Sequence, residues 1–297
     1  HNVTLIMSQR DEWLSEMEAA AQAAAKDTGI NLTTQDANSD TSKMIQYIES
    51  SVTAGEDAII INMVDPETAA QCIEAAGDVP VVFVNRFPGD PSVLNEKAVY
   101  VGSDEMTSGA FQGEFLAKFF KDQGKTDISY LMLNGILGQT STTTRTASVL
   151  KALEDNGIKA TAAAAPLAAD YDRATAMDII SPLLKTTKYD CIISNNDAMA
   201  LGAVEAMQQQ GLDPKSVPIV GIDATADGRQ AIKDSTLAMT VFQNAEGQGH
   251  ASLQAAANLI DGKPIAEGTG YEVDDENEFI IWVPFEPVTI DNVADYD

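Results

Sequence analysis

Histidine is nearly absent from this sequence, and this removes the usual base of many hydrolytic and acyl-transfer enzymes. Only His1, at the start of the chain, and His250, inside a helical pattern, occur among 297 residues. A Ser/His/Asp or Cys/His arrangement therefore lacks a base, and no group of His and Cys has the spacing of a metal site. The acidic run Asp274–Glu278 could in principle serve hydrolysis but is more typical of a solvated turn. We expect a protein that is not an enzyme and that holds no cofactor and no metal.

Basic residues are also scarce. The chain has 18 Lys and Arg against 45 Asp and Glu, which gives a formal net charge of -27 and a pI near 4.1. A surface of this sign repels a phosphate backbone, and no cluster of Lys and Arg offsets it. We therefore expect no nucleic-acid partner. The charge itself is typical of a solvated surface and says nothing about the fold.

Cysteines and long apolar runs are few as well. Cys72 and Cys191 are far apart in apolar contexts, which is typical of buried thiols rather than of a disulfide framework and does not indicate a compartment. No run has the length of a membrane span, and the first residues lead directly into a strand, so we expect any export signal to have been removed. Nucleotide-binding signals are missing too: no Gly-x-Gly-x-x-Gly follows a strand, and Gly124-Lys125-Thr126 has Phe119 where a phosphate loop needs glycine.

The first third of the chain alternates short apolar runs with amphipathic stretches. Strands are predicted at Val3–Met7, Asn31–Thr34, Ala58–Asn62, Val81–Asn85 and Ala98–Gly102, and helices from Leu14 to Gly29, at Ser42–Val52 and at Pro66–Ala76. This alternation is typical of a parallel sheet with helices on both faces.

The pattern then starts again. Helices are predicted at Thr107–Phe120, Thr144–Glu154, Arg173–Leu184, Asp197 to Gly211 and Asp227–Lys233, and strands at Ile128–Leu133, Lys159–Ala164, Cys191–Ile193, Val217–Ile222 and Leu237–Phe242. A helix at Gln248–Ile260 and strands at Tyr271–Val273 and Phe279–Val283 follow. The repeated order predicts an α/β protein with two similar Rossmann-like lobes.

Three segments separate one run of elements from the next: Gly102-Ser103, Asn244-Ala245-Glu246 and Pro284-Phe285. They predict an N-terminal lobe of residues 1–102 plus 246–283 and a C-terminal lobe of residues 103–245 plus 284–297. Three connections restrict two lobes to opening and closing about one axis, so we expect a clamp.

Polar residues follow the predicted strand Cys191–Ile193. Asn195 and Asn196 could simply make a turn, with Asp197 as the cap of the next helix. The carboxyl ends of strands in open α/β sheets also face the ligand crevice, so the same residues could bind a ligand. Of the three, Asn196 is the predicted ligand contact, Asp197 the predicted helix cap, and Asn195 the residue expected to hold the turn.

Six segments of the sequence carry a family resemblance: Ile61–Pro66, Val81–Asn85, Tyr100–Asp104, Gln112-Gly113, Asn195–Ala206 and Val220–Ala224. Together they resemble the type I solute-binding proteins of bacteria, and among them the periplasmic glucose/galactose-binding branch. The resemblance extends from residue 1 to about 285, and it is most specific at the Asn-Asn-Asp segment. Members of this family deliver sugars to ABC importers, and some also serve chemoreceptors.

The resemblance implies a set of ligand-binding residues around one sugar ring. Carboxylates accept hydrogen bonds from hydroxyls, amides donate and accept, and an arginine supplies a charged fork, which suits the rim of a sugar. Two flat rings would cover its apolar faces. Trp13 would be the ring below the sugar and Tyr171 the ring above it, although a place in the core of the first helix is the alternative for Trp13. The set is Asp11, Trp13, Asn85, Arg86, Gln139, Ser141, Arg145, Tyr171, Asn196, Asp223 and Gln243.

Some of these positions depart from the glucose/galactose branch. Gln139 and Ser141 stand where that branch has a histidine and an aspartate, so contacts near the anomeric carbon or the distal hydroxymethyl must differ. Gln243 and Arg86 resemble the residues that the ribose-binding branch has at these positions. Lys121–Asp127 is too short and too rich in lysine for the calcium loop of the glucose/galactose branch, so we expect no calcium there.

These features lead to a specific expectation, with alternatives. We expect the periplasmic or extracytoplasmic binding protein of an ABC sugar importer, as a free monomer or with a lipid anchor on the outer face of the cell membrane. The expected ligand is glucose or galactose, with a pentose as the alternative. The expected partners are the importer's membrane subunits and, as in some relatives, a chemoreceptor. The effector domain of a repressor would need a helix-turn-helix before the strand at Val3, and the sensing domain of a signalling receptor stays open.

Overall fold

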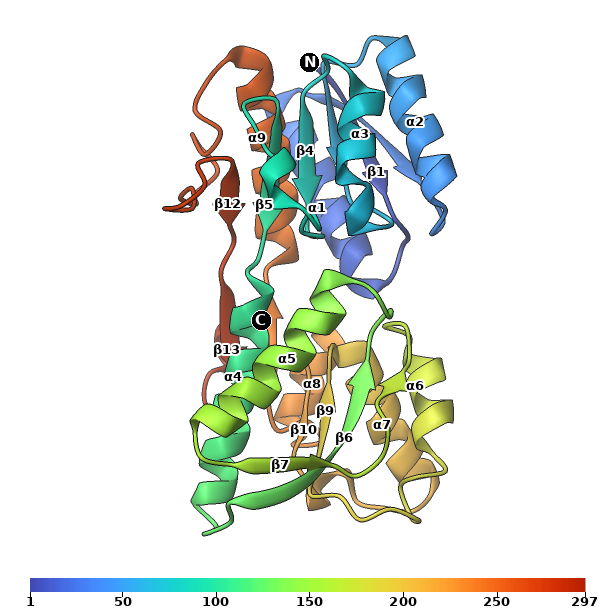
Figure 1. Ribbon diagram of the computed structural model, residues 1–297, viewed down its shortest axis with the longest axis vertical. Helices are drawn as coiled ribbons and strands as arrows, with labels where there is room; N and C mark the ends of the chain where they lie inside the picture. Colours follow the sequence, from blue (N-terminus) through green and yellow to red (C-terminus); the bar gives the residue numbers. More distant parts are fainter. Residues whose placement is uncertain (297) are drawn as a thin grey trace. The chain divides into compact units, whose positions relative to one another are not determined.

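The computed structural model describes residues 1–296 and divides the chain into two compact units. The first unit contains His1–Ser103 and Asn244–Pro284, and the second contains Asp104–Gln243 and the chain from Phe285 onward. The chain therefore passes from one unit to the other three times. Each unit has its own sheet and its own apolar cores, and Figure 1 shows the elements of both.

The first unit is built on a six-stranded sheet in which every neighbouring pair is parallel. The central strands are apolar throughout, as expected for strands that are buried on both faces. In spatial order the strands are β12 (Ile280–Trp282), β5 (Ala98–Gly102), β4 (Val81–Val84), β3 (Ala58–Ile61), β1 (Asn2–Met7) and β2 (Asn31–Asp36). The order reverses beside β1, the position at which such sheets place their ligands.

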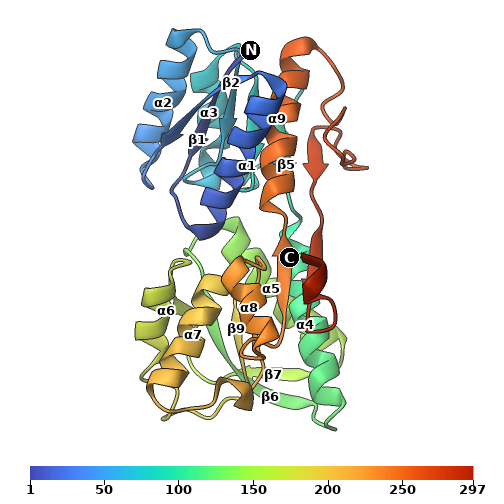
Figure 2. The ribbon, with the colours of Figure 1, turned by 180° about the vertical axis from the view of Figure 1, so that it is seen from behind.

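Helices cover both faces of this sheet. Helices α2 (Thr41–Ala54) and α3 (Ala69–Ala76), the latter preceded by the 3-10 turn Pro66–Thr68, pack on the face seen in Figure 1. Helices α1 (Glu12–Thr28) and α9 (Ala245–Asp261) pack on the face seen in Figure 2. Successive residues of one strand enter opposite cores: Leu5 lies in the core under α1 and Ile6 in the core under α2.

The second unit has a parallel sheet around β6 (Asp127–Asn134). Its spatial order is β10 (Ile219–Val220), β9 (Cys191–Ser194), β6 and β7 (Lys159–Ala162), and β8 (Leu167–Ala168) also pairs with β6. Helices α4 (Glu105–Lys121) and α5 (Thr140–Asp155) cover one face. Helices α6 (Arg173–Ile180), α7 (Asp197–Gln209) and α8 (Ala226–Lys233) cover the other. The predicted α/β fold with two similar lobes is confirmed.

One pair of strands departs from the parallel pattern. Strand β13 (Phe285–Val288) pairs antiparallel with β11 (Thr240–Gln243). The sequence analysis predicted only a crossing at Pro284-Phe285 and no strand after it, and the observed strand contains Pro287. Pro287 is tolerated here because β13 pairs only with β11 and is therefore an edge strand. The unpaired edge of such a strand needs no backbone N–H donor, which proline lacks.

Other predicted boundaries were wrong. Tyr271–Val273 forms no strand, only an isolated bridge from Val273 to Ile281. The carboxylate of Asp274 instead accepts the N–H groups of Glu276 and Asn277 and folds the segment into a turn. Helix α5 starts at Thr140 rather than at Thr144. The run of Thr and Ser there has low helix propensity, and packing of α5 against the sheet overrides it.

Candidate functional site

In the first unit, polar side chains at three neighbouring strand ends form one hydrogen-bonded group. Ser8 follows β1, and its hydroxyl donates to Asn62 Oδ1 at 2.6 Å. Asn62 follows β3, and its amide donates to the carbonyl of Val84 at 3.2 Å and to Asn85 Oδ1 at 3.4 Å. Asn85 follows β4 and donates from Nδ2 to Gln248 Oε1 at 3.4 Å. The parallel sheet thus brings the predicted ligand residue Asn85 into a network that orients its amide.

The backbone of Asn85 is left-handed, with φ of 67°, a conformation that costs free energy in residues other than glycine. Three bonds hold it there: its N–H donates to the carbonyl of Val101 at 2.9 Å, its carbonyl accepts the hydroxyl of Tyr100 at 2.8 Å, and its side chain is bonded as above. The ring of Tyr100 packs against Phe87 and Trp282. A Cβ on Gly102 would lie 1.9 Å from the Tyr100 hydroxyl, so only glycine fits there.

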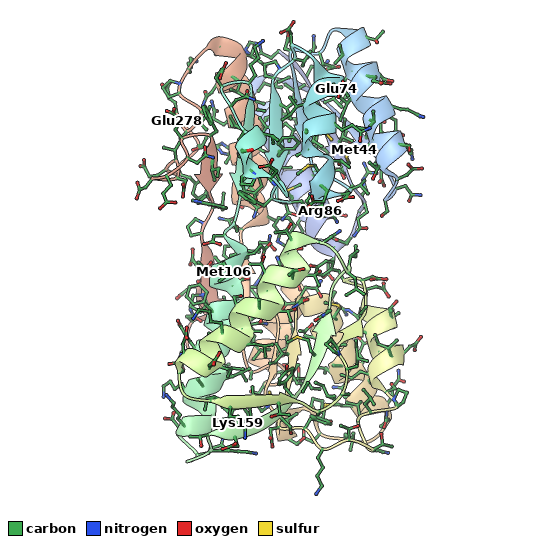
Figure 3. The ribbon with its side chains drawn as sticks, in the orientation of Figure 1. Met44, Glu74, Arg86, Met106, Lys159 and Glu278 are labelled. Atoms are coloured by element: carbon green, nitrogen blue, oxygen red, sulfur yellow. The ribbon has the colours of Figure 1, made fainter. Side chains whose placement is uncertain are left out.

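Arg86, next to Asn85, donates hydrogen bonds to backbone carbonyls. Its Nη1 donates to the carbonyl of Met63 at 2.8 Å and to that of Val64 at 3.2 Å. The residue is 9% exposed, and Figure 3 labels it at the end of the first unit where β4 finishes. These bonds fix the loop after β3 to the loop after β4, so Arg86 has a structural role in addition to its predicted ligand role.

Asp11 and Trp13 lie at the start of α1. Asp11 is the N-cap of the helix: its Oδ1 accepts the N–H of Leu14 at 2.8 Å, and its Oδ2 accepts Gln9 Nε2 at 3.3 Å. Trp13 is 6% exposed and belongs to the apolar core that α1 and α9 share, with Leu14 and Met17. Trp13 therefore lies in the core, as the alternative in the sequence analysis had it. Its role in ligand binding stays a prediction.

In the second unit, the segment after β9 has a different division of roles from the predicted one. Asn196, not Asp197, is the N-cap of α7, and its Oδ1 accepts the N–H of Met199 at 3.0 Å. The assignment of Asp197 as the cap was wrong, because its carboxylate turns away from its own helix. Asn195 holds the turn as expected: its Oδ1 accepts the N–H of Gly135 at 3.1 Å, which ties the end of β9 to the end of β6.

The carboxylate of Asp197 is fully buried and joins three segments. Its Oδ1 accepts the hydroxyl of Thr240 at 2.6 Å, and its Oδ2 accepts the N–H of Thr225 at 3.0 Å. Gly221 fits beside it because a Cβ there would lie 2.2 Å from Oδ1. Asp197 therefore stabilises the loops after β9 and β10.

We expect Asp197→Asn to lower the free energy of unfolding by about 2 kcal/mol or more, because one amide N–H₂ would then face a donor in a buried site. Urea unfolding followed by circular dichroism measures the change. Glu205→Gln is the matched control on the same helix, because the side chain of Glu205 is 43% exposed; we expect it to stay within about 0.5 kcal/mol of the parent. Equal stability of the two variants would contradict this role of Asp197.

Arg145 is the buried centre of the second unit's polar group. From α5, its Nε and Nη2 donate to the two carboxylate oxygens of Glu105 at 2.6 and 2.9 Å. Nη1 donates to the carbonyl of Asn195 at 2.8 Å, and Nη2 also donates to Gln243 Oε1 at 3.2 Å. Burial lowers the pKa of Arg145, but the charge and hydrogen bonds of Glu105, together with the charges of Tyr171 and Asp223, outweigh burial and raise the pKa overall. The guanidinium is therefore permanently charged and held in one orientation.

Tyr171 is positioned by its backbone and by two hydroxyls. Its φ is 63°, and its Oη lies 2.8 Å from Ser141 Oγ and 2.9 Å from Thr142 Oγ1. The ring of Tyr171 lies against Gly135. A Cβ on residue 135 would come within 2.0 Å of this ring, so a side chain there would clash with it. Burial raises the pKa of the phenol. The hydroxyl of Ser141, predicted to bind the ligand, thus also fixes a predicted ring.

Three further predicted residues belong to the second unit: Gln139, Asp223 and Gln243. Gln139 is the N-cap residue of α5, but its side chain makes no capping bond. Asp223 has φ of 122° and follows β10. Its N–H donates to the carbonyl of Val241, and its carbonyl accepts the N–H of Gln243. The structure therefore brings Arg145, Asp223 and Gln243 together.

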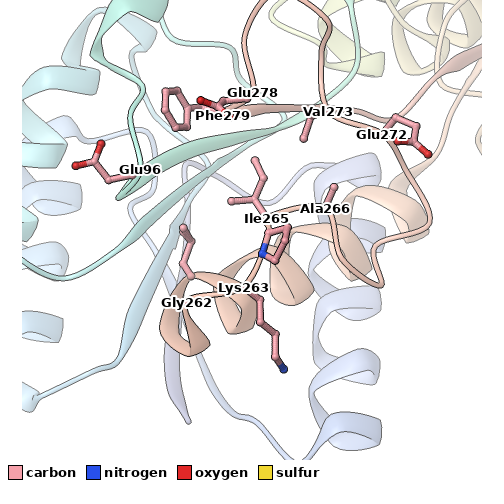
Figure 4. Close-up of a pocket in the computed structure, with 11 residues that line it drawn as sticks. Glu96, Gly262, Lys263, Ile265, Ala266, Glu272, Val273, Glu278 and Phe279 are labelled. Atoms are coloured by element: carbon pink, nitrogen blue, oxygen red, sulfur yellow. The ribbon is translucent and has the colours of Figure 1, made fainter.

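A separate cavity of about 490 Å³ lies within the first unit. Figure 4 shows it beside the loop after α9, with Phe279 and Ile265 on its wall and Glu96, Glu272 and Glu278 as its carboxylates. None of the predicted ligand-binding residues lines this cavity, so it is distinct from the candidate site.

Comparison with known proteins identifies the family. Residues 3–264 match the family model described as periplasmic binding protein domain. The chain belongs to the periplasmic binding protein family. It is 34% identical over 302 residues to the D-galactose/methyl-galactoside binding periplasmic protein MglB of Haemophilus influenzae, covering 96% of this chain and 88% of that protein. It is 28% identical over 252 residues to the ribose import binding protein RbsB of Bacillus subtilis, covering 84% of this chain and 78% of that protein.

A solved structure agrees in fold. The ABC transporter solute binding protein of Bacillus halodurans with bound myo-inositol superimposes with a TM-score of 0.83 at 29% identity, covering 99% of this chain and 96% of that one. This periplasmic binding protein is thus a sugar-binding protein of the ABC importer type and not an enzyme. In residues 1–296, no helix is both long and apolar enough to cross a bilayer.

The sequence analysis assigned no role in the site to several residues that support the predicted ligand residues. Glu105 pairs with Arg145, Tyr100 holds the carbonyl of Asn85, and Gln112 donates to the carbonyls of Ser194 and Gly221 at 2.9 and 3.0 Å. Tyr100 and Gln112 lie in segments that carry the resemblance, and Glu105 stands shortly after the predicted strand Ala98–Gly102. Their partners are distant in sequence and have no local pattern.

Proposed function

We propose that this periplasmic binding protein binds one neutral monosaccharide through the polar strand ends of both units and delivers it to an ABC importer. The observation that carries the proposal is backbone strain at predicted ligand residues. Of the eight non-glycine residues with positive φ among residues 1–296, three are Asn85, Tyr171 and Asp223. Strained backbone of this kind concentrates at binding sites, where it fixes the direction of a side chain.

The proposed roles follow from the side-chain chemistry. Asp11 and Asp223 accept hydrogen bonds from ligand hydroxyls, and Asn85, Gln139, Asn196 and Gln243 supply amides. Ser141 supplies a hydroxyl, and Arg86 and Arg145 supply N–H groups. Trp13 and Tyr171 cover the apolar faces of the ring. Micromolar affinity corresponds to about -8 kcal/mol, which several charge-assisted bonds and two rings can provide.

Glucose or galactose is the proposed ligand, supported by the similarity to a galactose-binding protein over most of both chains. A pentose is the alternative, supported by the similarity to a ribose import protein and by Gln243 and Arg86. A cyclitol is a further candidate because the related structure of Bacillus halodurans contains myo-inositol. Binding by both units at once would draw them closed around the ligand and favour the closed form by its differential contacts.

A thermal-shift screen tests the proposal. Because a ligand that binds only the folded protein raises its melting temperature, we expect a rise of several degrees with at least one neutral hexose, pentose or cyclitol at millimolar concentration. Mannitol at equal concentration controls for a general polyol effect. If no monosaccharide or cyclitol exceeds the mannitol control, the proposed function is wrong.

The remaining proposals concern location and partners. Family membership supports a periplasmic protein, with a lipid anchor on the outer face of the membrane as a proposed variant. We further propose that the protein acts as a monomer, that the importer's membrane subunits are its partners, and that a chemoreceptor is a second reader of the liganded form. Size-exclusion chromatography with light scattering tests the monomeric state.

A further inference from the structure

The ion pair with Glu105 takes up two of the five N–H groups of Arg145. Glu105 stands in the first turn of α4 and is 8% exposed. It accepts from Nε and Nη2 at 2.6 and 2.9 Å, so the two-pronged side of the guanidinium faces Glu105 and not a ligand.

The remaining donors of Arg145 can be counted. A guanidinium has five N–H groups. Asn195 and Gln243 accept two more of them at 2.8 and 3.2 Å. One N–H on Nη1 is then left without a partner among residues 1–296. The arginine can therefore give a ligand a single directed hydrogen bond, which suits a hydroxyl and not a carboxylate, since a carboxylate is best bound by two parallel N–H groups.

The charges around Arg145 also favour a neutral ligand over an anionic one. The carboxylate of Glu105 compensates the charge of Arg145, and Asp223 is a second negative group close enough to act on that charge. A ligand carboxylate would have to displace Glu105 or lie near carboxylates without a free cation, and like charges in a poorly solvated site cost affinity. A neutral hydroxyl meets no such opposition.

We infer that Glu105 determines specificity: by occupying the fork of Arg145, it makes the site select neutral sugars over sugar acids. The inference rests on the proposed function, because Arg145 must contact the ligand. Glu105 acts through Arg145 and is a positioning residue. Replacing its charge frees both the fork and the positive charge for an anionic ligand.

The experiment compares neutral and anionic ligands by isothermal titration calorimetry. The neutral ligand is the sugar with the largest shift in the thermal screen, and the anionic probes are galacturonate and glucuronate. We expect the wild type to prefer the neutral sugar and Glu105→Gln to reduce that preference about tenfold, by weaker binding of the neutral sugar and stronger binding of a uronate. A purely structural role would weaken both ligands alike and leave the ratio unchanged.

Two further variants separate charge from folding. Glu105→Asp keeps the charge on a shorter side chain, so the neutral sugar should stay preferred. Glu114→Gln removes an exposed carboxylate from the same helix, and its ratio should equal that of the wild type. Melting curves identify any variant that does not fold. If Glu105→Gln is unfolded, Glu105→Asp tests the inference in its place. Loss of the preference for the neutral sugar in folded Glu105→Asp overturns the inference.

The two levels of the proposal fail in different ways. If the wild type binds no neutral sugar, the proposed function is wrong and the inference falls with it. If the wild type binds a neutral sugar but the ratio in folded Glu105→Gln stays within about threefold of the wild-type ratio, only the inference is overturned. The same holds if that variant binds neither uronate at millimolar concentration.

Discussion

Asp223→Ala is expected to reduce sugar affinity at least about a hundredfold while the second unit stays folded. A carboxylate that accepts from ligand hydroxyls contributes about 1.5–3 kcal/mol per bond, and two such bonds would be lost together. The backbone bonds of Asp223 to Val241 and Gln243 do not involve its side chain, so they persist in the variant. Isothermal titration measures the affinity, and circular dichroism checks the fold.

The control for this prediction is Asp227→Ala, a nearby carboxylate whose side chain is 60% exposed and pairs with Arg173. An exposed ion pair contributes about 0–1 kcal/mol, so this variant should bind sugar like the parent. A folded Asp223→Ala protein with unchanged affinity would exclude Asp223 from the site.

Arg145→Ala is expected to have the second large effect, on affinity and on stability together. Removal of the guanidinium leaves the buried carboxylate of Glu105 unpaired, and breaking a buried ion pair in this way costs about 3–5 kcal/mol. The carbonyl of Asn195 and the amide oxygen of Gln243 also lose their donor. We expect no measurable sugar binding and a clearly lower melting temperature.

The double variant Arg145→Ala with Glu105→Ala separates the two effects. Without Glu105 no buried charge stays unpaired, so stability should recover in part, whereas sugar binding should not recover. This non-additivity is the signature of a direct pair. Recovery of both properties would show that Arg145 acts only on the fold, and recovery of neither would show that the ion pair is not the source of the instability.

Much of the fold is predictable from short-range patterns. The strand Val81–Asn85 and the helix from Leu14 to Gly29 were predicted within one or two residues, because apolar runs and glycine caps are local signals. The strand at Phe285–Val288 was not predicted, since its pairing with β11 depends on a partner about forty residues earlier. The helix start at Thr140 was missed because packing overrode poor local propensity.

The ligand-binding residues stay a prediction from the resemblance, and the residues that support them could not be predicted from the sequence. Asn85, Arg145 and Asp223 were predicted through the resemblance, and the structure shows the hydrogen bonds that each of them makes. Glu105 could not be identified because it reaches Arg145 only after α4 and α5 pack together. The role of Asp197 was wrong for the same reason: a local rule predicted a cap, whereas distant Thr240 and Thr225 compete for the carboxylate.

The most direct test of the account is the stoichiometry of sugar binding to the wild-type protein. Isothermal titration with the neutral sugar that gives the largest thermal shift should show one site per chain, because residues of both units are proposed to contact the same molecule. The affinity should be micromolar or tighter, about -8 kcal/mol or more favourable. Two independent sites per chain, or no heat of binding with any neutral sugar, would contradict it.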